Sequence, residues 1–94
     1  MSSQGIMLSG AIRLRGGDEH VHAARRLRER LDRVDWREGG EGPTLELRED
    51  ADLAEGAFRI EAGPDRVTVH GGPFSGVIYG VEELIGRAAR SDRL

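Results

Sequence analysis

The chain contains no cysteine and no lysine, and all 14 of its basic residues are arginine. Without cysteine there is no disulfide framework, no thiolate nucleophile and no zinc–thiolate site, and the redox compartment is left open. We interpret the arginine usage as a matter of genome composition, although the guanidinium group does favour paired hydrogen bonds to carboxylates.

Long apolar stretches are also lacking. No segment approaches the ~20 consecutive apolar residues that a transmembrane helix needs, so we expect no membrane partner. The first ten residues, MSSQGIMLSG, have no basic region followed by an apolar run and therefore indicate no signal peptide. The cellular location stays open, with the cytoplasm as the favoured expectation.

The chain has no excess of positive charge. Its formal net charge is -3, whereas nucleic-acid-binding domains usually carry a basic excess, so we expect no nucleic-acid partner. A double-stranded-RNA-binding domain would also begin with a helix, and this chain begins with a strand pattern. The length of 94 residues and the composition, 37% hydrophobic and 33% charged, indicate one small domain over 1–94, with 1–5 as a flexible tail.

What the sequence does contain is a regular alternation of apolar and charged residues. Between Ile6 and Arg15 the apolar residues fall on even positions, which predicts a half-buried strand. A helix of about 17 residues should follow, longer than average but ordinary. Asp18 is its expected N-cap, and its apolar stripe ends at Val34.

Three more strands and a second helix are predicted after the glycine-rich breaker REGGEGP. Alternating residues predict strands at 45–48, 58–62 and 66–70, and a GPD turn joins the last two as an antiparallel hairpin. Apolar residues from Val77 to Ala88 then recur at helical spacing.

The predicted order of elements is β-α-β-β-β-α. Because each strand has one apolar and one charged face, the sheet should be covered on one side only, by both helices. The predicted fold is therefore α+β, a two-layer α/β sandwich with a four-stranded mixed sheet and two helices on one face.

Four glycines follow His70, just before and inside the second predicted helix. The segment GGPFSG stands between a strand and a helix, where a phosphate could bind, but it has neither the lysine nor the spacing of a phosphate-binding loop. Glycine inside a helix costs about 1 kcal/mol relative to alanine. We therefore interpret Gly71 and Gly72 as a turn, and Gly76 and Gly80 as a face that lets the helix approach the sheet closely.

Two pairs of polar residues have the wrong spacing for a metal site or for a catalytic acid–base pair. His20 and His22 would point about 200° apart on a helix and cannot hold one ion from the same face. Glu82 and Glu83 are neighbours on one helix, whereas the two carboxylates of a glycosidase face each other across a cleft. Glu83 is better placed to pair with Arg87, one helical turn further on.

A serine–histidine–aspartate set cannot be argued either. Ser75, His70 and Asp65 are close in sequence, but the serine has no strained elbow motif around it. His70 belongs to the charged face of the sheet, where it could contact a partner. We therefore expect no catalytic, cofactor-binding or metal-binding residue in this chain, and no cofactor.

Aromatic side chains are scarce, at 4% of the residues. We assign Phe58 to the buried face of its strand, Phe74 and Tyr79 to the packing around the start of the second helix, and Trp36 to the end of the first helix. Their expected place is therefore the core, although a carbohydrate-binding module would present such residues as exposed platforms.

The segment GAFRIEAGPDRVTVHGGPFSGVIYGVEELIGR, about a third of the chain, resembles a known accessory domain. It is similar to the small α/β domain before the catalytic barrel in family-20 β-N-acetylhexosaminidases, α-glucuronidases and bacterial hyaluronidase-like glycosidases. The likeness lies in the strand that begins at Phe58, the turn and strand from Pro64, and the helix start with Gly76, Tyr79 and Gly80. Where those domains often continue with Thr-Leu-Gln-Leu-Leu, this chain has Val-Glu-Glu-Leu-Ile.

The resemblance implies a non-catalytic N-terminal domain that packs beside the barrel of a glycoside hydrolase. The catalytic carboxylates of those enzymes lie in the barrel, which needs about 250 residues, so none can be assigned to this chain. The chain also stops at ARSDRL directly after its last predicted helix, which we interpret as a cut through a longer protein.

The leading hypothesis is thus docking onto the catalytic barrel of a parent chain, through a helix face or the charged sheet face. A free-standing module that binds a carbohydrate or another small ligand is the alternative, and an enzyme in its own right is a third. An isolated domain could also self-associate through its uncovered face. The sheet-face residues expected to dock are Arg13, Arg15, Arg48, Arg59, Glu61 and Arg66.

Overall fold

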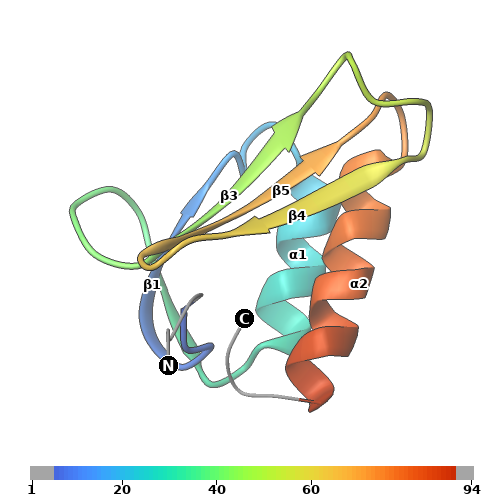
Figure 1. Ribbon diagram of the computed structural model, residues 1–94. Helices are drawn as coiled ribbons and strands as arrows, with labels where there is room; N and C mark the ends of the chain where they lie inside the picture. Colours follow the sequence, from blue (N-terminus) through green and yellow to red (C-terminus); the bar gives the residue numbers. More distant parts are fainter. Residues whose placement is uncertain (1–5, 91–94) are drawn as a thin grey trace.

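A five-stranded mixed sheet and two helices that cover one of its faces build the fold (Figure 1). The computed structural model describes residues 6–90, so the expected tail 1–5 lies outside the described residues. The arrangement confirms the predicted two-layer α+β sandwich, with one strand more than expected. The strands are β1 (Gly10–Arg15), β2 (Val34–Arg37), β3 (Thr44–Glu49), β4 (Phe58–Ala62) and β5 (Arg66–Gly71), and the helices are α1 (Val21–Arg30) and α2 (Gly76–Arg90).

The sheet has the strand order β2-β1-β3-β5-β4. β1 runs parallel to both β2 and β3, β3 runs parallel to β5, and only β4 is antiparallel to its neighbour β5. The predicted hairpin of the last two strands is therefore confirmed, with Phe58 opposite Gly71 and Ala62 opposite Val67. The two edges of the sheet are β2 and β4.

The register of the strands gives the sheet one apolar face and one charged face, as the alternation of residues in the sequence predicts. On the side of the helices, the strands contribute aliphatic side chains that are buried almost completely, and α1 and α2 add theirs from the other layer. The fully buried large side chains are all aliphatic: Ile12, Leu27, Leu45, Leu84, Val67, Val69 and Val81.

The prediction for the first helix is wrong in length and in its start. α1 ends at Arg30, Leu31 caps its C-terminus, and the chain turns into β2, whose Val34 pairs with Gly10. Leu31 and Val34 are both buried, so their apolar side chains continue the helical spacing past the end of α1. For this reason the sequence pattern predicted helix where β2 begins. The residue before the helix is His20, without a side-chain cap bond, so Asp18 is not the N-cap.

The first strand is shorter than expected, because β1 begins at Gly10 and not at Ile6. Ile6 and Leu8 are nevertheless buried in the core cluster. The apolar residues of this segment therefore have the predicted burial without belonging to the strand.

Gly80 and Gly76 bring α2 close to the sheet, as we inferred from their spacing. A Cβ added at Gly80 would lie 2.5 Å from Cγ1 of Val69 in β5, and one at Gly76 would lie 2.5 Å from the carbonyl oxygen of Ala57. These distances are shorter than side chains tolerate, so only glycine permits this approach.

Arg26 of α1 and Glu82 of α2 join the two helices on their outer side. Arg26 donates from Nε to Oε2 of Glu82 at 2.6 Å and from Nη2 to Oε1 at 3.0 Å. The hydrogen bonds from Arg26 hold the pKa of the Glu82 carboxyl below its usual value. The neighbouring Glu83 pairs with Arg87 at 3.0 Å, as its spacing predicts.

Glu82→Gln is expected to lower the free energy of unfolding by a small amount at neutral pH, because the pair is exposed to water. Since the pKa of Glu82 is lower in the folded than in the unfolded chain, this stabilisation is present above the unfolded pKa and is lost as the pH falls through the folded one. Urea unfolding of both proteins from neutral to acidic pH should show the difference vanishing in acid. Glu55→Gln, in an exposed loop, is the control, and a difference that does not change with pH would contradict the account.

Candidate functional site

The face of the sheet without helices carries mainly charged side chains, as expected. The register of the five strands places six arginines and three carboxylates on it, an excess of positive charge on a chain whose formal net charge is -3. The arginines are Arg13, Arg15, Arg37, Arg48, Arg59 and Arg66, and the carboxylates are Asp35, Glu46 and Glu61.

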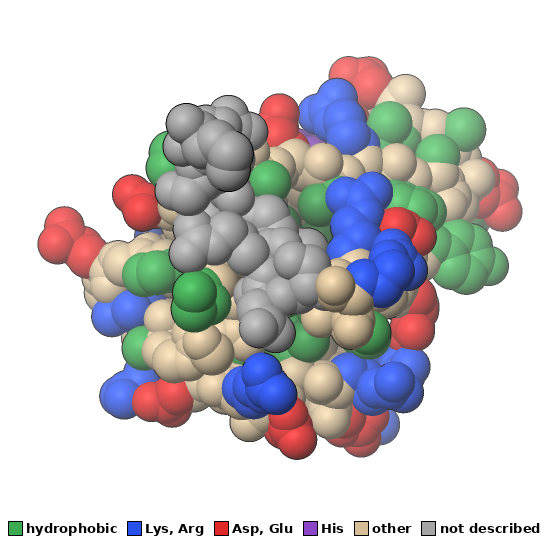
Figure 2. Space-filling view, turned by 60° about the horizontal axis from the view of Figure 1, so that its bottom comes forward, with side chains coloured by type: hydrophobic (Ala, Val, Ile, Leu, Met, Phe, Trp, Pro, Cys, Tyr) green, Lys and Arg blue, Asp and Glu red, His purple; other side chains and the backbone are tan. Residues whose placement is uncertain are grey.

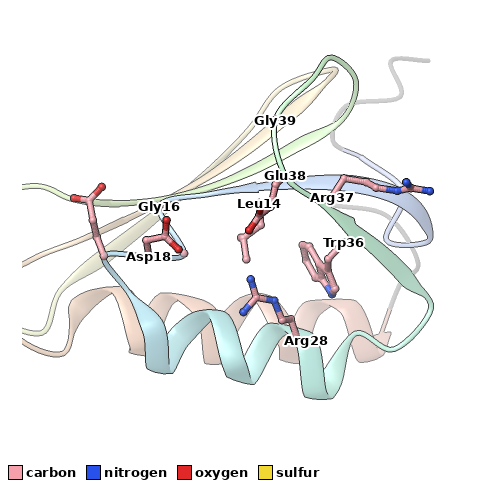
Figure 3. A pocket seen from close by; sticks show the side chains of 10 residues that line it. Leu14, Gly16, Asp18, Arg28, Trp36, Arg37, Glu38 and Gly39 are labelled. Carbon is pink, nitrogen blue, oxygen red and sulfur yellow. The ribbon is translucent and has the colours of Figure 1, made fainter.

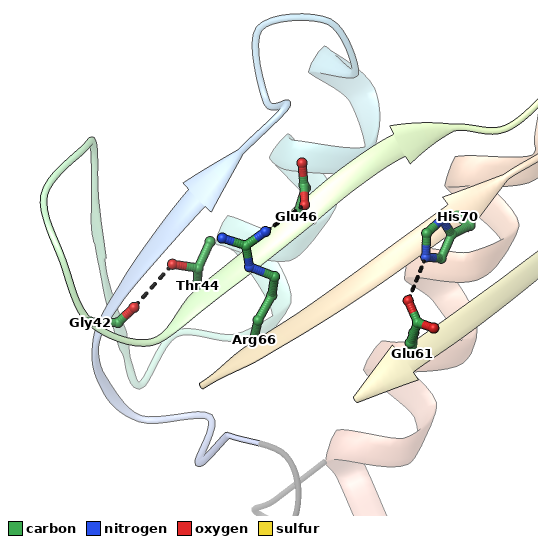
Figure 4. Close-up of polar contacts among 6 residues, drawn as sticks. All are labelled: Gly42, Thr44, Glu46, Glu61, Arg66 and His70. Atoms are coloured by element: carbon green, nitrogen blue, oxygen red, sulfur yellow. Dashed lines mark hydrogen bonds and ion pairs between the residues drawn. The ribbon is translucent and has the colours of Figure 1, made fainter. Parts of the chain in front are cut away.

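Part of this charge is neutralised within the face itself. Arg66 donates to Glu46 across β5 and β3 at 3.3 Å (Figure 4), and Arg37 donates to Asp35 at 2.6 Å. His70 lies on this face as predicted, but it is only 7% exposed and its Nε2 lies 3.1 Å from Oε1 of Glu61. It is therefore engaged inside the molecule and not available to a partner.

Three of the four aromatic side chains lie on the surface, so the expectation of a core position is wrong for them. Phe74 is 82% exposed, Tyr79 53% and Phe58 38%, and Ile78, which precedes Tyr79 in the sequence, is 36% exposed. We call these four residues the aromatic end. At Phe58 the close approach of α2 limits the space, because a Cβ on Gly80 would lie 2.5 Å from Cγ1 of Val69 and 3.2 Å from Cβ of Phe58.

The segment that enters β4 brings the aromatic end together. Gly56 donates from its amide to the carbonyl oxygen of Pro73 at 3.3 Å, and a Cβ on Gly56 would lie 3.5 Å from the Tyr79 ring. A Cβ on Gly80 would likewise lie 3.2 Å from Cβ of Phe58. Figure 2 shows hydrophobic side chains gathered at the right-hand end of the molecule, the end where α2 begins in Figure 1.

The backbone holds Phe74 in an unfavourable conformation. Its φ is 68°, in the left-handed region, and no other described residue except glycine has a positive φ. Such a conformation costs of order 1–3 kcal/mol in a residue with a side chain. Since the side chain of Phe74 is almost fully exposed, its burial within the domain does not offset this cost.

The glycine segment before α2 serves close packing, which supports our interpretation of a turn. The amide of Gly72 donates to the carbonyl oxygen of Ala57 at 2.7 Å, and a Cβ at Gly72 would overlap the backbone of Ala54. A Cβ at Gly71 would overlap the amide nitrogen of Val77. The amide of Tyr79 bonds to the carbonyl oxygen of Ser75, so Ser75 is the last residue before the helix.

A cleft of about 520 Å³ lies at the ends of β1 and β2, between these strands and α1 (Figure 3). Trp36 lies in β2, and not at the end of the first helix as expected, and it forms one wall. Arg28 extends from α1 towards Leu14, with Asp18 from the loop after β1 on the other side. The indole Nε1 of Trp36 is buried and has no hydrogen-bond partner in the part of the chain that the structure describes.

The polar residues weighed for catalysis are not brought together. Asp65 precedes β5 and His70 lies near its other end, while Ser75 stands before α2. In residues 6–90 no group of three or more histidine, aspartate or glutamate side chains could hold a metal ion. No helix in the same range is long and apolar enough to cross a membrane.

Comparison with known proteins gives a likeness of fold. No protein-family model and no curated protein matches the sequence. Among solved structures, a GH138 enzyme that targets pectin rhamnogalacturonan II has a segment of the same fold, with a TM-score of 0.70 and 20% sequence identity. The likeness covers 87% of this chain but only 14% of that enzyme, so the shared fold is confined to one small part of the enzyme.

Proposed function

We propose that the chain is a non-catalytic N-terminal accessory domain of a glycoside hydrolase, and that it packs against the catalytic barrel through its aromatic end. The observation that carries this proposal is Phe74, an almost fully exposed aromatic side chain on a left-handed backbone. Neither the exposure nor the conformation stabilises the isolated domain, and both are accounted for by a partner that covers the ring.

The aromatic end is a better docking surface than the charged sheet face. Burying apolar area contributes roughly 25 cal/mol per Å², and aromatic residues dominate the binding energy of interfaces. The arginines of the sheet face would have to give up water, and two of them, Arg37 and Arg66, already pair with carboxylates of the same face. The sheet face therefore serves as a solvated surface.

Two observations support the relation to glycoside hydrolases. The GH138 enzyme contains this fold within a much longer chain, as an accessory domain requires. The sequence also resembles the domain before the barrel in hexosaminidases and α-glucuronidases, and the residues that carry this resemblance include Phe58 and Tyr79 of the aromatic end. Which of these enzyme families the parent protein belongs to stays a prediction.

The gene beyond the codon of Leu94 tests the accessory role. We expect the reading frame to continue into a barrel of about 250 residues with a pair of catalytic carboxylates. The longer protein should hydrolyse a chromogenic glycoside that the 94-residue chain leaves unchanged. A stop codon after Leu94, or turnover by the 94-residue chain itself, would contradict the proposal.

The double variant Phe74→Ser/Tyr79→Ser tests the docking surface in that longer protein. Calorimetry should show one unfolding transition for the wild type and a separate, earlier transition of the accessory domain in the variant, because the interface has lost its aromatic side chains. The matched control is Arg48→Ser/Arg59→Ser on the sheet face, which should leave the transition undivided. A transition divided only by the arginine variant would move the interface to the sheet.

A further inference from the structure

We propose that the cleft between Trp36 and Arg28 binds one neutral sugar ring. The cleft lies between the strands and α1, apart from the aromatic end, so this proposal does not depend on the docking surface. Its volume of about 520 Å³ is within the roughly 300–1,000 Å³ of ligand pockets. It also lies beyond the carboxyl ends of two parallel strands, where ligands of α/β sheets commonly bind.

Trp36 gives the cleft a flat apolar wall. The ring is partly exposed, and the C–H groups on one face of a pyranose could stack against it. Its buried Nε1 has no acceptor within residues 6–90, which costs about 1–3 kcal/mol that a phenylalanine would not incur. The stability of the domain therefore does not explain an indole at this position, whereas a large aromatic wall does.

The polar groups around the wall are mixed in sign, and one of them, Arg37, already pairs with Asp35. Arg28 offers a fork of N–H donors, and Asp18 and Glu38 offer carboxylate acceptors from two different loops (Figure 3). None of the three forms a hydrogen bond or ion pair with another residue in the range 6–90. They remain available to a ligand.

This mixture selects the chemistry of the ligand. The lining holds the carboxylates of Asp18, Glu19 and Glu38 beside the guanidinium of Arg28, so an ion of either sign meets at least one like charge. Hydroxyl groups donate and accept at once, so a ring with several neighbouring hydroxyls can satisfy the carboxylates and the guanidinium together. A neutral carbohydrate combines such hydroxyls with an apolar face for Trp36.

The fluorescence of Trp36 provides a direct test, because it is the chain's single tryptophan. The 94-residue chain is titrated with methyl glycosides of glucose, galactose, mannose and xylose, and with galacturonate as the anionic comparison. We expect a saturable change with at least one neutral glycoside, with a Kd of about 1–10 mM, and a weaker response to galacturonate. No saturable change with any of the four, or tighter binding of galacturonate, would overturn the proposal.

Variants separate the cleft from the rest of the surface. Arg28→Ala should weaken the binding of the responding glycoside about tenfold, because it removes charged hydrogen-bond donors. Arg25→Ala, on the same helix but outside the cleft, is the matched control and should bind as the wild type does. Thermal unfolding confirms that both variants are folded, and equal binding by the Arg28 variant and the wild type would contradict the assignment.

Discussion

Gly71→Ala is expected to unfold the domain. Its new Cβ would overlap the amide nitrogen of Val77 and lie 2.5 Å from the carbonyl carbon of Gly76, and these backbone atoms cannot move without displacing α2 from the sheet. Overpacking a core costs typically 1–3 kcal/mol when side chains can give way, and more when backbone must shift. That is a large part of the roughly 5–14 kcal/mol expected for a domain of this size. Circular dichroism should show loss of the cooperative thermal transition.

Gly86→Ala provides the control for this prediction. Gly86 lies in α2, and a Cβ there would meet only Nη1 of Arg90, at 3.8 Å. Since alanine is the better helix former, we expect this variant to gain about 0.5–1 kcal/mol of stability. The same change from glycine to alanine would thus lower the stability of the domain at position 71 and raise it at position 86. Equal effects of the two substitutions would show that close packing of α2 is not what Gly71 provides.

Leu84→Ala is expected to cost about 2–5 kcal/mol of folding free energy. Leu84 lies in α2, is fully buried in the core between the two layers, and leaves a cavity when it is shortened. The helix itself does not suffer, because alanine has the highest helix propensity. Urea denaturation should show a lower midpoint with an unchanged slope.

Ile78→Ala distinguishes the core stripe of α2 from the aromatic end. Ile78 belongs to the same helix and is 36% exposed, so its shortening should cost less than about 1.5 kcal/mol in the isolated domain. A loss as large as that of the Leu84 variant would mean that Ile78 packs inside the domain, and that the aromatic end is not free to contact a partner.

The alternation and spacing of apolar residues were sufficient to predict most of the architecture. The hairpin of β4 and β5 and the apolar stripe of α2 follow from side-chain periodicity alone, because burial on one face dictates it. β2 could not be found in this way. Its four residues are too few for a pattern, and no glycine or proline marks the turn after Leu31.

The candidate sites were harder to predict than the fold. The aromatic end depends on a positive φ at Phe74 and on the depth to which α2 sinks towards Val69, and neither has a signal in local sequence. The cleft is formed by side chains from the loop after β1, from α1 and from the region of β2. Because the sequence pattern did not predict β2, it could not predict the cleft. The glycine spacing was the exception, because Gly76 and Gly80 could serve only shape once a phosphate loop was excluded.

The most direct test of an accessory role is the structure of the longer protein that we expect the gene to encode. It should show Phe74 and Tyr79 covered by the catalytic barrel, at the end of the domain where α2 begins. Rings that remain open to solvent while another face of the domain rests on the barrel would contradict the account.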